Sequence, residues 1–299
     1  MYILFAVLAL FSSVGNTIFN RISSHKIGTI LSATIKSLMI TVACLLICLS
    51  FGHIKELYAL SKTDWLWVGI LGLITIVDWL FYFLGLKTSH LEAFAPFEVS
   101  AILFFSNLLF SIFMISTVTS GASTLNIILF YGGLALIFVS MIYIVFNKKI
   151  NPAKKLYWVI FSLISALALS FTFLIVKLKL PHLHSDIIAF HQMLIVFIVC
   201  AILLCFSKER SEIKTVKAKT YLNFFLSAIF NALLMVFRYT ALASANANPS
   251  IINIIICCDF VFVSTATVLF FKADNKKQLV VIILLIVSGM ILNALPAIL

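Results

Sequence analysis

Apolar stretches of about 20 residues recur from one end of the chain to the other, and each is long enough to cross a hydrocarbon core of roughly 30 Å as an α-helix. The connections between them are short, and none is long enough to hold a soluble domain. The pattern therefore predicts an all-α integral membrane protein with ten transmembrane helices. The ten candidates are residues 2–20, 28–51, 65–86, 91–114, 125–146, 156–176, 185–206, 221–243, 250–271 and 278–297.

The composition agrees with a multi-pass membrane protein. Of the 299 residues, 63% are hydrophobic and only 10% are charged, whereas a soluble domain carries roughly 25% charged residues. The first apolar stretch has no basic segment before it and no convincing cleavage site, so we expect a retained helix rather than a signal peptide. We expect the protein in a bacterial inner (plasma) membrane, in contact with the lipid bilayer.

The net charge of +11 reports on orientation rather than on nucleic-acid binding. Lys and Arg of membrane proteins collect in the loops of the cytoplasmic side. Of the 21 Lys and Arg, fifteen follow the odd-numbered apolar stretches and four lie on the opposite face. This count predicts cytoplasmic loops after the odd-numbered stretches, both termini outside, and no nucleic-acid partner.

The chain matches itself when it is shifted by 156 residues. The shift pairs Phe81 with Phe237, Leu86 with Leu242, Phe104 with Phe260, Ala33 with Ala189, Cys44 with Cys200 and Gly133 with Gly289. It predicts two five-helix repeats, residues 1–150 and residues 151–299. Because five is an odd number, the second repeat must enter the membrane from the opposite side. Such inverted repeats are typical of secondary transporters, whose binding sites lie near the membrane midplane between the halves.

The third and eighth stretches end in "YFLGLKTS" (82–89) and "YTALASA" (239–245), and Lys36 lies within the second. In these features and in its two five-helix halves, the chain resembles the EamA-type permeases of the drug/metabolite transporter superfamily. The resemblance implies cytoplasmic termini, which conflicts with the charge count, so both orientations stay open. Two segments depart from the family: "STVTSGAST" (116–124) and "FKADNKK" (271–277) stand where many members carry Gly-Glu.

Five ionisable residues lie inside the predicted helices: Lys36, Asp78, Glu98, Arg238 and Asp259. A charge at the centre of a transmembrane helix costs roughly 2.5–3.5 kcal/mol. The five together would cost an amount comparable with the whole stability of a domain if they faced lipid. We therefore expect them to face the interior of the bundle, where they pair with one another or line water.

Polar residues form one stripe on each of two predicted helices. Thr75, Asp78 and Tyr82 share a face of the third stretch, and Asn231 and Arg238 share a face of the eighth. The shift of 156 residues maps Thr75 to Asn231 and Tyr82 to Arg238. We therefore expect both stripes to face one central cavity.

The same shift maps Lys36 to Gln192, so this position is polar in both halves. Arg238 is expected to bind an anionic group of the substrate, with Tyr239 or Asn231 nearby, because its planar guanidinium suits a carboxylate or phosphate. The alternative is that Lys36–Asp78 and Arg238–Asp259 are structural ion pairs. The two interpretations are compatible if such a pair opens to admit a charged ligand. The candidate substrate-binding residues are Lys36, Asp78, Tyr82, Gln192, Asn231, Arg238, Tyr239 and Asp259.

Glu98 is the candidate coupling residue. Burial disfavours the charged form of a carboxyl group, so a buried glutamate can take up a proton near neutral pH. The alternative is that Glu98 is an ion-pair partner of Lys36. Among the neighbouring polar and aromatic residues, Trp79 either packs in the core, which we favour, or lines a cavity, and Asn16 either bonds between helices or contacts substrate.

The sequence contains no HExxH, GxSxG or P-loop motif, so we expect no enzyme activity and no cofactor. The "HLH" at 182–184 is a weak metal signal, and we expect no metal. The best interpretation is a secondary-active transporter that moves a small polar or zwitterionic metabolite, such as an amino acid, by alternating access, with protons as the possible coupling ion. The alternatives are a flippase for a lipid-linked head group, or a membrane enzyme or scaffold that transports nothing.

Overall fold

The computed structural model describes residues 1–24, 27–89, 91–118, 123–150, 156–263 and 275–297. The described residues are almost entirely helical and contain no strand, which confirms the all-α prediction. The elements are α1 (Tyr2–Ser24), α2 (Thr29–Phe51), η1 (His53–Tyr58), α3 (Lys62–Thr88), α4 (Leu91–Val118), α5 (Thr124–Phe146), α6 (Tyr157–Lys179), α7 (Ser185–Phe206), η2 (Lys208–Thr215), α8 (Ala218–Ala243), α9 (Pro249–Cys257), α11 (Lys276–Ala294) and η3 (Leu295–Ala297).

Nine helices in the described part of the chain are long and apolar enough to cross a membrane. The predicted stretch 250–271 is described only as far as Val263, as a shorter apolar helix that is interrupted at Cys258. Residues 264–271 lie outside the described residues. So do Lys26, Lys154, Lys155 and Lys272 of the charge count, residues 119–122 and 271–274 of the predicted departures, and residues 151–155 beside the predicted boundary between the repeats.

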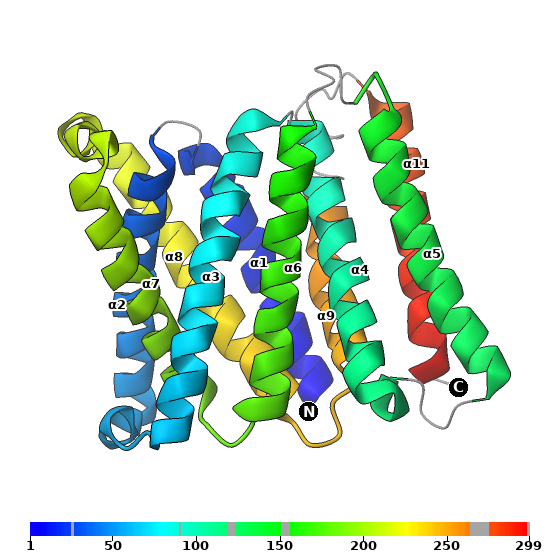
Figure 1. The fold of residues 1–299 in the computed structure, drawn as a ribbon, viewed down its shortest axis with the longest axis horizontal. Helices are drawn as coiled ribbons and strands as arrows, with labels where there is room; N and C mark the ends of the chain where they lie inside the picture. The colour runs from blue at the N-terminus through cyan, green and yellow to red at the C-terminus, as the bar shows by residue number, and fades with distance from the viewer. Residues whose placement is uncertain (25–26, 90, 119–122, 151–155, 264–274, 298–299) are drawn as a thin grey trace.

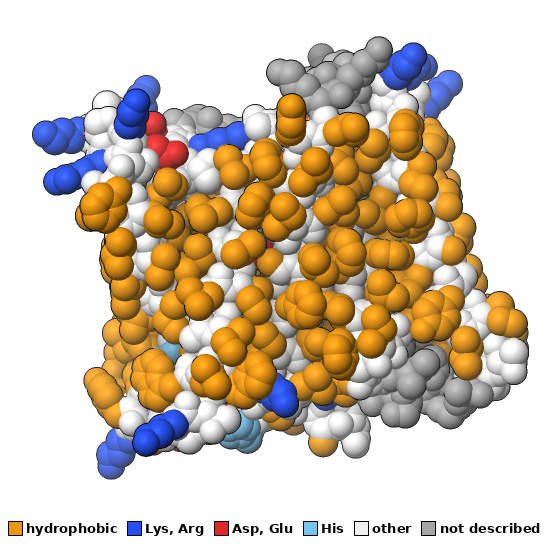
Figure 2. Space-filling model, in the orientation of Figure 1, with side chains coloured by type: hydrophobic (Ala, Val, Ile, Leu, Met, Phe, Trp, Pro, Cys, Tyr) orange, Lys and Arg blue, Asp and Glu red, His pale blue; other side chains and the backbone are white. Residues whose placement is uncertain are grey.

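The surface has the distribution that a bilayer requires. Figure 2 shows hydrophobic side chains over the flank of the bundle and Lys and Arg at its two ends. Large apolar side chains such as Leu46, Phe138 and Leu284 are exposed to the surroundings of the bundle. Because lipid rather than water covers such a belt, its exposure carries no hydrophobic penalty in the membrane.

The helices pack in a reciprocal pattern. Helix α1 packs on α8 and α3 packs on α6, while α2 packs on α7 and α5 packs on α11. Helices α2 and α7 lie on one side of the molecule and α5 and α11 on the opposite side (Figure 1). Figure 1 also shows that α1 rises from the end that carries the N-terminus, whereas α6 descends to that same end.

Helices α5 and α11 cross at two glycines. A Cβ atom on Gly133 would lie 2.6 Å from the Gly289 carbonyl oxygen and from the Asn293 amide nitrogen. A Cβ atom on Gly289 would lie 3.0 Å from the Gly133 carbonyl oxygen and 3.2 Å from the Ile137 amide nitrogen. Each glycine thus lets the other helix approach to backbone contact, as small residues do at helix interfaces in membranes.

Candidate functional site

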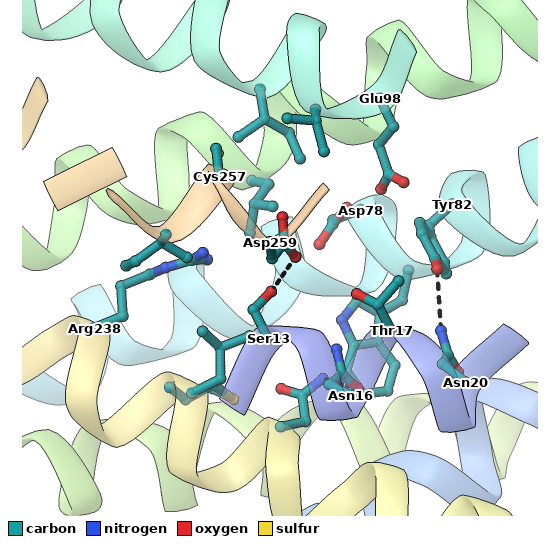
Figure 3. A pocket seen from close by; sticks show the side chains of 18 of the residues that line it. Ser13, Asn16, Thr17, Asn20, Asp78, Tyr82, Glu98, Arg238, Cys257 and Asp259 are labelled. Carbon is teal, nitrogen blue, oxygen red and sulfur yellow. Dashed lines mark hydrogen bonds between the residues drawn. The ribbon is translucent and has the colours of Figure 1, made fainter. Parts of the chain in front are cut away.

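A cavity of about 180 Å³ lies inside the bundle, and it is lined by residues of α1, α2, α3, α4, α6, α7 and α8 and of the chain around α9 (Figure 3). The structure brings all nine candidate residues of the sequence analysis to this cavity, although they come from six separate segments. They are Lys36, Asp78, Tyr82, Glu98, Gln192, Asn231, Arg238, Tyr239 and Asp259.

Lys36 is held by the amide of Asn16 rather than by a carboxylate. Its side chain is only 3% exposed, and its Nζ atom donates a hydrogen bond of 3.0 Å to Asn16 Oδ1. The same oxygen accepts hydrogen bonds from Ser227 Oγ at 2.9 Å and from Asn231 Nδ2 at 3.4 Å. Lys36 Nζ also lies 5.3 Å from the centroid of the Trp79 ring, within the range of a cation–π interaction.

Asp78 has a different partner from the one that the ion-pair interpretation predicted. Ser165 on α6 donates a hydrogen bond of 2.6 Å to Asp78 Oδ1. Among the described residues, no ion pair joins Lys36 and Asp78, so this predicted pair is wrong. The physical reason is competition, because the Ser165 hydroxyl binds Asp78 and the Asn16 amide binds Lys36. Both charged groups still line the cavity.

Asp259 lies directly after the interruption of the ninth span at Cys258. It accepts a hydrogen bond of 2.5 Å from Ser13 Oγ on α1. Figure 3 shows this bond at the centre of the cavity, with the Asp78 carboxylate nearby. A polar group from α1 therefore positions a carboxylate that comes from the other half of the chain.

Arg238 reaches the cavity from α8, and Figure 3 shows its guanidinium group directed towards the side of Asp259. The guanidinium carbon lies 4.4 Å from the centroid of the Phe173 ring. Its Nε atom is buried and has no hydrogen-bond partner among the described residues. An unsatisfied buried donor costs free energy, and a ligand with an anionic group would remove that cost.

Gln192 lies in a closed set of neutral hydrogen bonds. Its Nε2 atom donates to Thr75 Oγ1 at 2.6 Å, and its Oε1 atom accepts from the Tyr239 hydroxyl at 2.7 Å. Tyr239 and Gln192 are both buried. Tyr239 therefore binds Gln192, although it is the sequence neighbour of Arg238.

Tyr82 and Arg238 lie near opposite ends of the cavity. Tyr82 follows the first residue of α3 by 20 positions and Arg238 follows the first residue of α8 by 20 positions, while the two helices run in opposite directions (Figure 1). The Tyr82 hydroxyl accepts a hydrogen bond of 3.1 Å from Asn20 Nδ2. Glu98 completes the lining from α4, on the side away from α1 (Figure 3).

Residues 156–295 match the model of the EamA-like transporter family. The second half of this chain belongs to that family. The match confirms the resemblance to EamA-type permeases of the drug/metabolite transporter superfamily. Together with the apolar helices, the match supports a multi-pass integral membrane transporter of that type.

One solved structure, described only as the crystal structure of a protein, matches 97% of this EamA-like chain and 96% of its own length. Its TM-score is 0.68 and its sequence identity is 16%, so the likeness extends to the fold alone. No curated protein matches the chain.

Sequence reasoning missed part of the polar lining of this EamA-like protein. Ser13 and Asn20 on α1 were not singled out, yet both line the cavity. Trp79 does both of the things considered for it, since it packs against the core and also lines the cavity. A signal for α1 was present, because Ser13, Asn16 and Asn20 follow one another at intervals of three and four residues and so share one face of the helix. Ser165, the partner of Asp78, carried no comparable signal.

Proposed function

We propose that the chain is a secondary-active transporter that moves a small zwitterionic metabolite, such as an amino acid or a related compound, by alternating access through this cavity. The observation that carries the proposal is the charge of the lining. Two cationic and three acidic side chains line this cavity of about 180 Å³. Drug-sized ligands occupy pockets of roughly 300–1,000 Å³, so the volume favours a small solute, and the mixed charge favours a zwitterion.

The roles of the lining residues follow from their contacts. Arg238 would bind the anionic group, because its Nε donor is unsatisfied among the described residues and guanidinium suits a carboxylate. Asp78 and Asp259 would bind the cationic group, since each carboxylate faces the cavity beside one serine hydroxyl. Lys36, Tyr82, Asn231, Gln192 and Tyr239 would shape and polarise the rest of the site, and Glu98 would carry a coupling proton.

Alternating access would use residues 1–150 and 151–299 as two inverted repeats. Two features support this arrangement. The helix contacts are reciprocal under the shift of 156 residues, since α1 on α8 corresponds to α6 on α3. The glycine crossing is also reciprocal, since Gly133 with Asn293 corresponds to Gly289 with Ile137. Rocking of such repeats against each other exposes a shared midplane site to each side in turn. A bacterial inner membrane is the expected setting.

The test is uptake by the purified protein in liposomes, first with a mixture of radiolabelled amino acids. For an amino acid that is taken up, two analogues then compete: its methyl ester, which lacks the anionic group, and its N-acetyl derivative, which lacks the cationic group. We expect the parent compound to compete at least about 10-fold better than either analogue, because each lost charge-assisted hydrogen bond is worth roughly 1.5–3 kcal/mol. Equal competition by all three, or movement only of a lipid-linked head group, would refute a zwitterion site.

A further inference from the structure

Three histidines meet three carboxylates at the end of the bundle that carries the N-terminus, where Figure 2 shows the histidine side chains. His182 Nε2 lies 3.0 Å from Asp64 Oδ1, His53 Nδ1 lies 2.9 Å from Asp186 Oδ2, and His184 Nε2 lies 3.4 Å from Glu56 Oε2. One member of each pair lies between α2 and α3 or at the start of α3. The other member lies between α6 and α7 or at the start of α7. None of these residues lines the central cavity.

Two of the three pairs converge on one point. The imidazole rings of His53 and His184 stack with their centroids 4.0 Å apart and an angle of 19° between their planes. His53, Glu56 and His184 each offer a ligand atom, and these three atoms lie within 4.8 Å of one another.

We propose that His53, Glu56 and His184 bind a divalent transition-metal ion, for which Zn²⁺ is the natural probe. Two imidazole nitrogens and one carboxylate oxygen form a familiar three-ligand Zn²⁺ set, with water in the fourth position. Ligand bonds of about 2.1 Å in a tetrahedron place ligand atoms roughly 3.4 Å apart. The side chains of His184 and Glu56 are 53% and 49% exposed, so both are free to close the remaining ångström.

Asp186 supplies the outer support that such sites require. Its carboxylate contacts Nδ1 of His53, so Nε2 of the same ring is the nitrogen that remains to bind the ion. Metal-binding histidines usually give their other ring nitrogen to a carboxylate or a carbonyl, which fixes the ring and strengthens the ligand. Asp186 is itself buried, whereas His53 is half-buried, so the less mobile group holds the more mobile one.

A bound ion would tie η1, from the first half of the chain, to the connection before α7, from the second half. This goes beyond the proposed transport and does not depend on it. The sequence did not predict the site, because His53 and Glu56 lie about 130 residues before His184 and only the fold brings them together. The expectation of no metal rested on the "HLH" spacing alone, whose first histidine binds Asp64 instead.

The test is Zn²⁺ binding by the purified full-length protein in detergent, measured by isothermal titration calorimetry after removal of metals with a chelator. We expect one Zn²⁺ per chain, and a loss of affinity of at least about 10- to 100-fold in Asp186→Asn, the range for loss of an outer-shell partner. His184→Ala should lose more. His182→Ala is the matched control, because His182 lies in the same connection but pairs with Asp64, and it should bind as the wild type does.

The proposal is overturned if the wild type does not bind Zn²⁺ at 1:1 stoichiometry, or if His184→Ala binds Zn²⁺ with the same affinity as the wild type. Thermal melting of each variant in chelator separates lost binding from lost folding, and Glu56→Gln, at an exposed position, serves if His184→Ala fails to fold. Cys205 is exposed and could bind Zn²⁺ by itself, so loss of the site in Cys205→Ser would also contradict the assignment. Because the readout is binding, it is independent of whether the protein transports an amino acid.

Discussion

Lys36 and Gln192 lie 156 residues apart, at corresponding places in α2 and α7, but their surroundings differ in kind. Gln192 uses both ends of its amide within the protein, on Thr75 and Tyr239. Lys36 carries three donors, of which the described residues take one, through Asn16. The Gln192 side is a closed neutral network, whereas the Lys36 side keeps donors for a ligand.

The contrast extends to every charge in the cavity. At a distance of 156 residues, Asp78 corresponds to Leu234, Glu98 to Ile254, Arg238 to Tyr82 and Asp259 to Leu103. No Lys, Arg, Asp or Glu of the lining has a charged residue as its counterpart. The charged residues of the lining come from both halves of the chain, and none is matched by a charge at the corresponding position of the other half.

The largest effect is expected at Glu98, whose counterpart is Ile254. Glu98→Gln should abolish accumulation of substrate against a gradient and leave exchange across the membrane largely intact, because the amide keeps the shape but binds no proton. Glu98→Asp, which keeps the acid, is the matched control. Liposomes with and without an imposed proton gradient provide the measurement, and accumulation by Glu98→Gln would remove the coupling role. Loss of folded protein would instead favour the ion-pair interpretation of Glu98.

Lys36→Met should come next, with flux reduced by about 30-fold or more, since loss of one partner from a buried charged contact costs roughly 2–5 kcal/mol. Its stability should change little, because Asn16 Oδ1 keeps its hydrogen bonds from Ser227 and Asn231. Flux in liposomes and thermal melting are measured on the same preparation. Normal flux would show that Lys36 has only a structural role, and the contrast between Lys36 and Gln192 would then be lost.

Gln192→Leu should show the reverse. The Tyr239 hydroxyl would lose its partner while Thr75 keeps its bond to the Leu71 carbonyl, so we expect a destabilisation of about 1–3 kcal/mol and only a small change in flux. Denaturant unfolding in detergent measures the first and liposome uptake the second. A Gln192→Leu protein with normal stability but no flux would mean that both sides bind substrate.

The smallest changes test the packing that both halves share. Gly133→Ala and Gly289→Ala should each lower stability by about 1–3 kcal/mol, because the new methyl group meets backbone atoms of the facing helix. Gly132→Ala is the control, since a Cβ atom there has no neighbour within 4 Å among the described residues. Unequal losses of thermal stability in Gly133→Ala and Gly289→Ala would contradict the interpretation that the crossing is reciprocal.

The sequence predicted the helices and the charged lining for the same physical reason. Lipid excludes charge, so an ionisable residue such as Asp78 in an apolar stretch must face inwards. That argument says nothing about partners. Asn16 and Ser165 hold Lys36 and Asp78, but in a membrane helix amides and hydroxyls bond to many neighbours. The interruption before Asp259 was also beyond prediction, because it depends on packing that an apolar sequence does not encode locally.

The most direct test of the central claim, that the cavity binds an anionic group of the substrate, is Arg238→Lys. Tyr82, which lies 156 residues before Arg238, carries no charge and so cannot replace the guanidinium group. The variant should melt without substrate as the wild type does, which shows normal folding. With the amino acid that the wild type transports, the substrate-induced thermal shift and the liposome flux should show binding weakened by about 10- to 150-fold, as loss of a charge-assisted hydrogen bond requires. Normal binding by Arg238→Lys, together with normal flux in a variant that carries both Arg238→Leu and Asp259→Leu, would show that Arg238 is only a structural partner and would contradict the account.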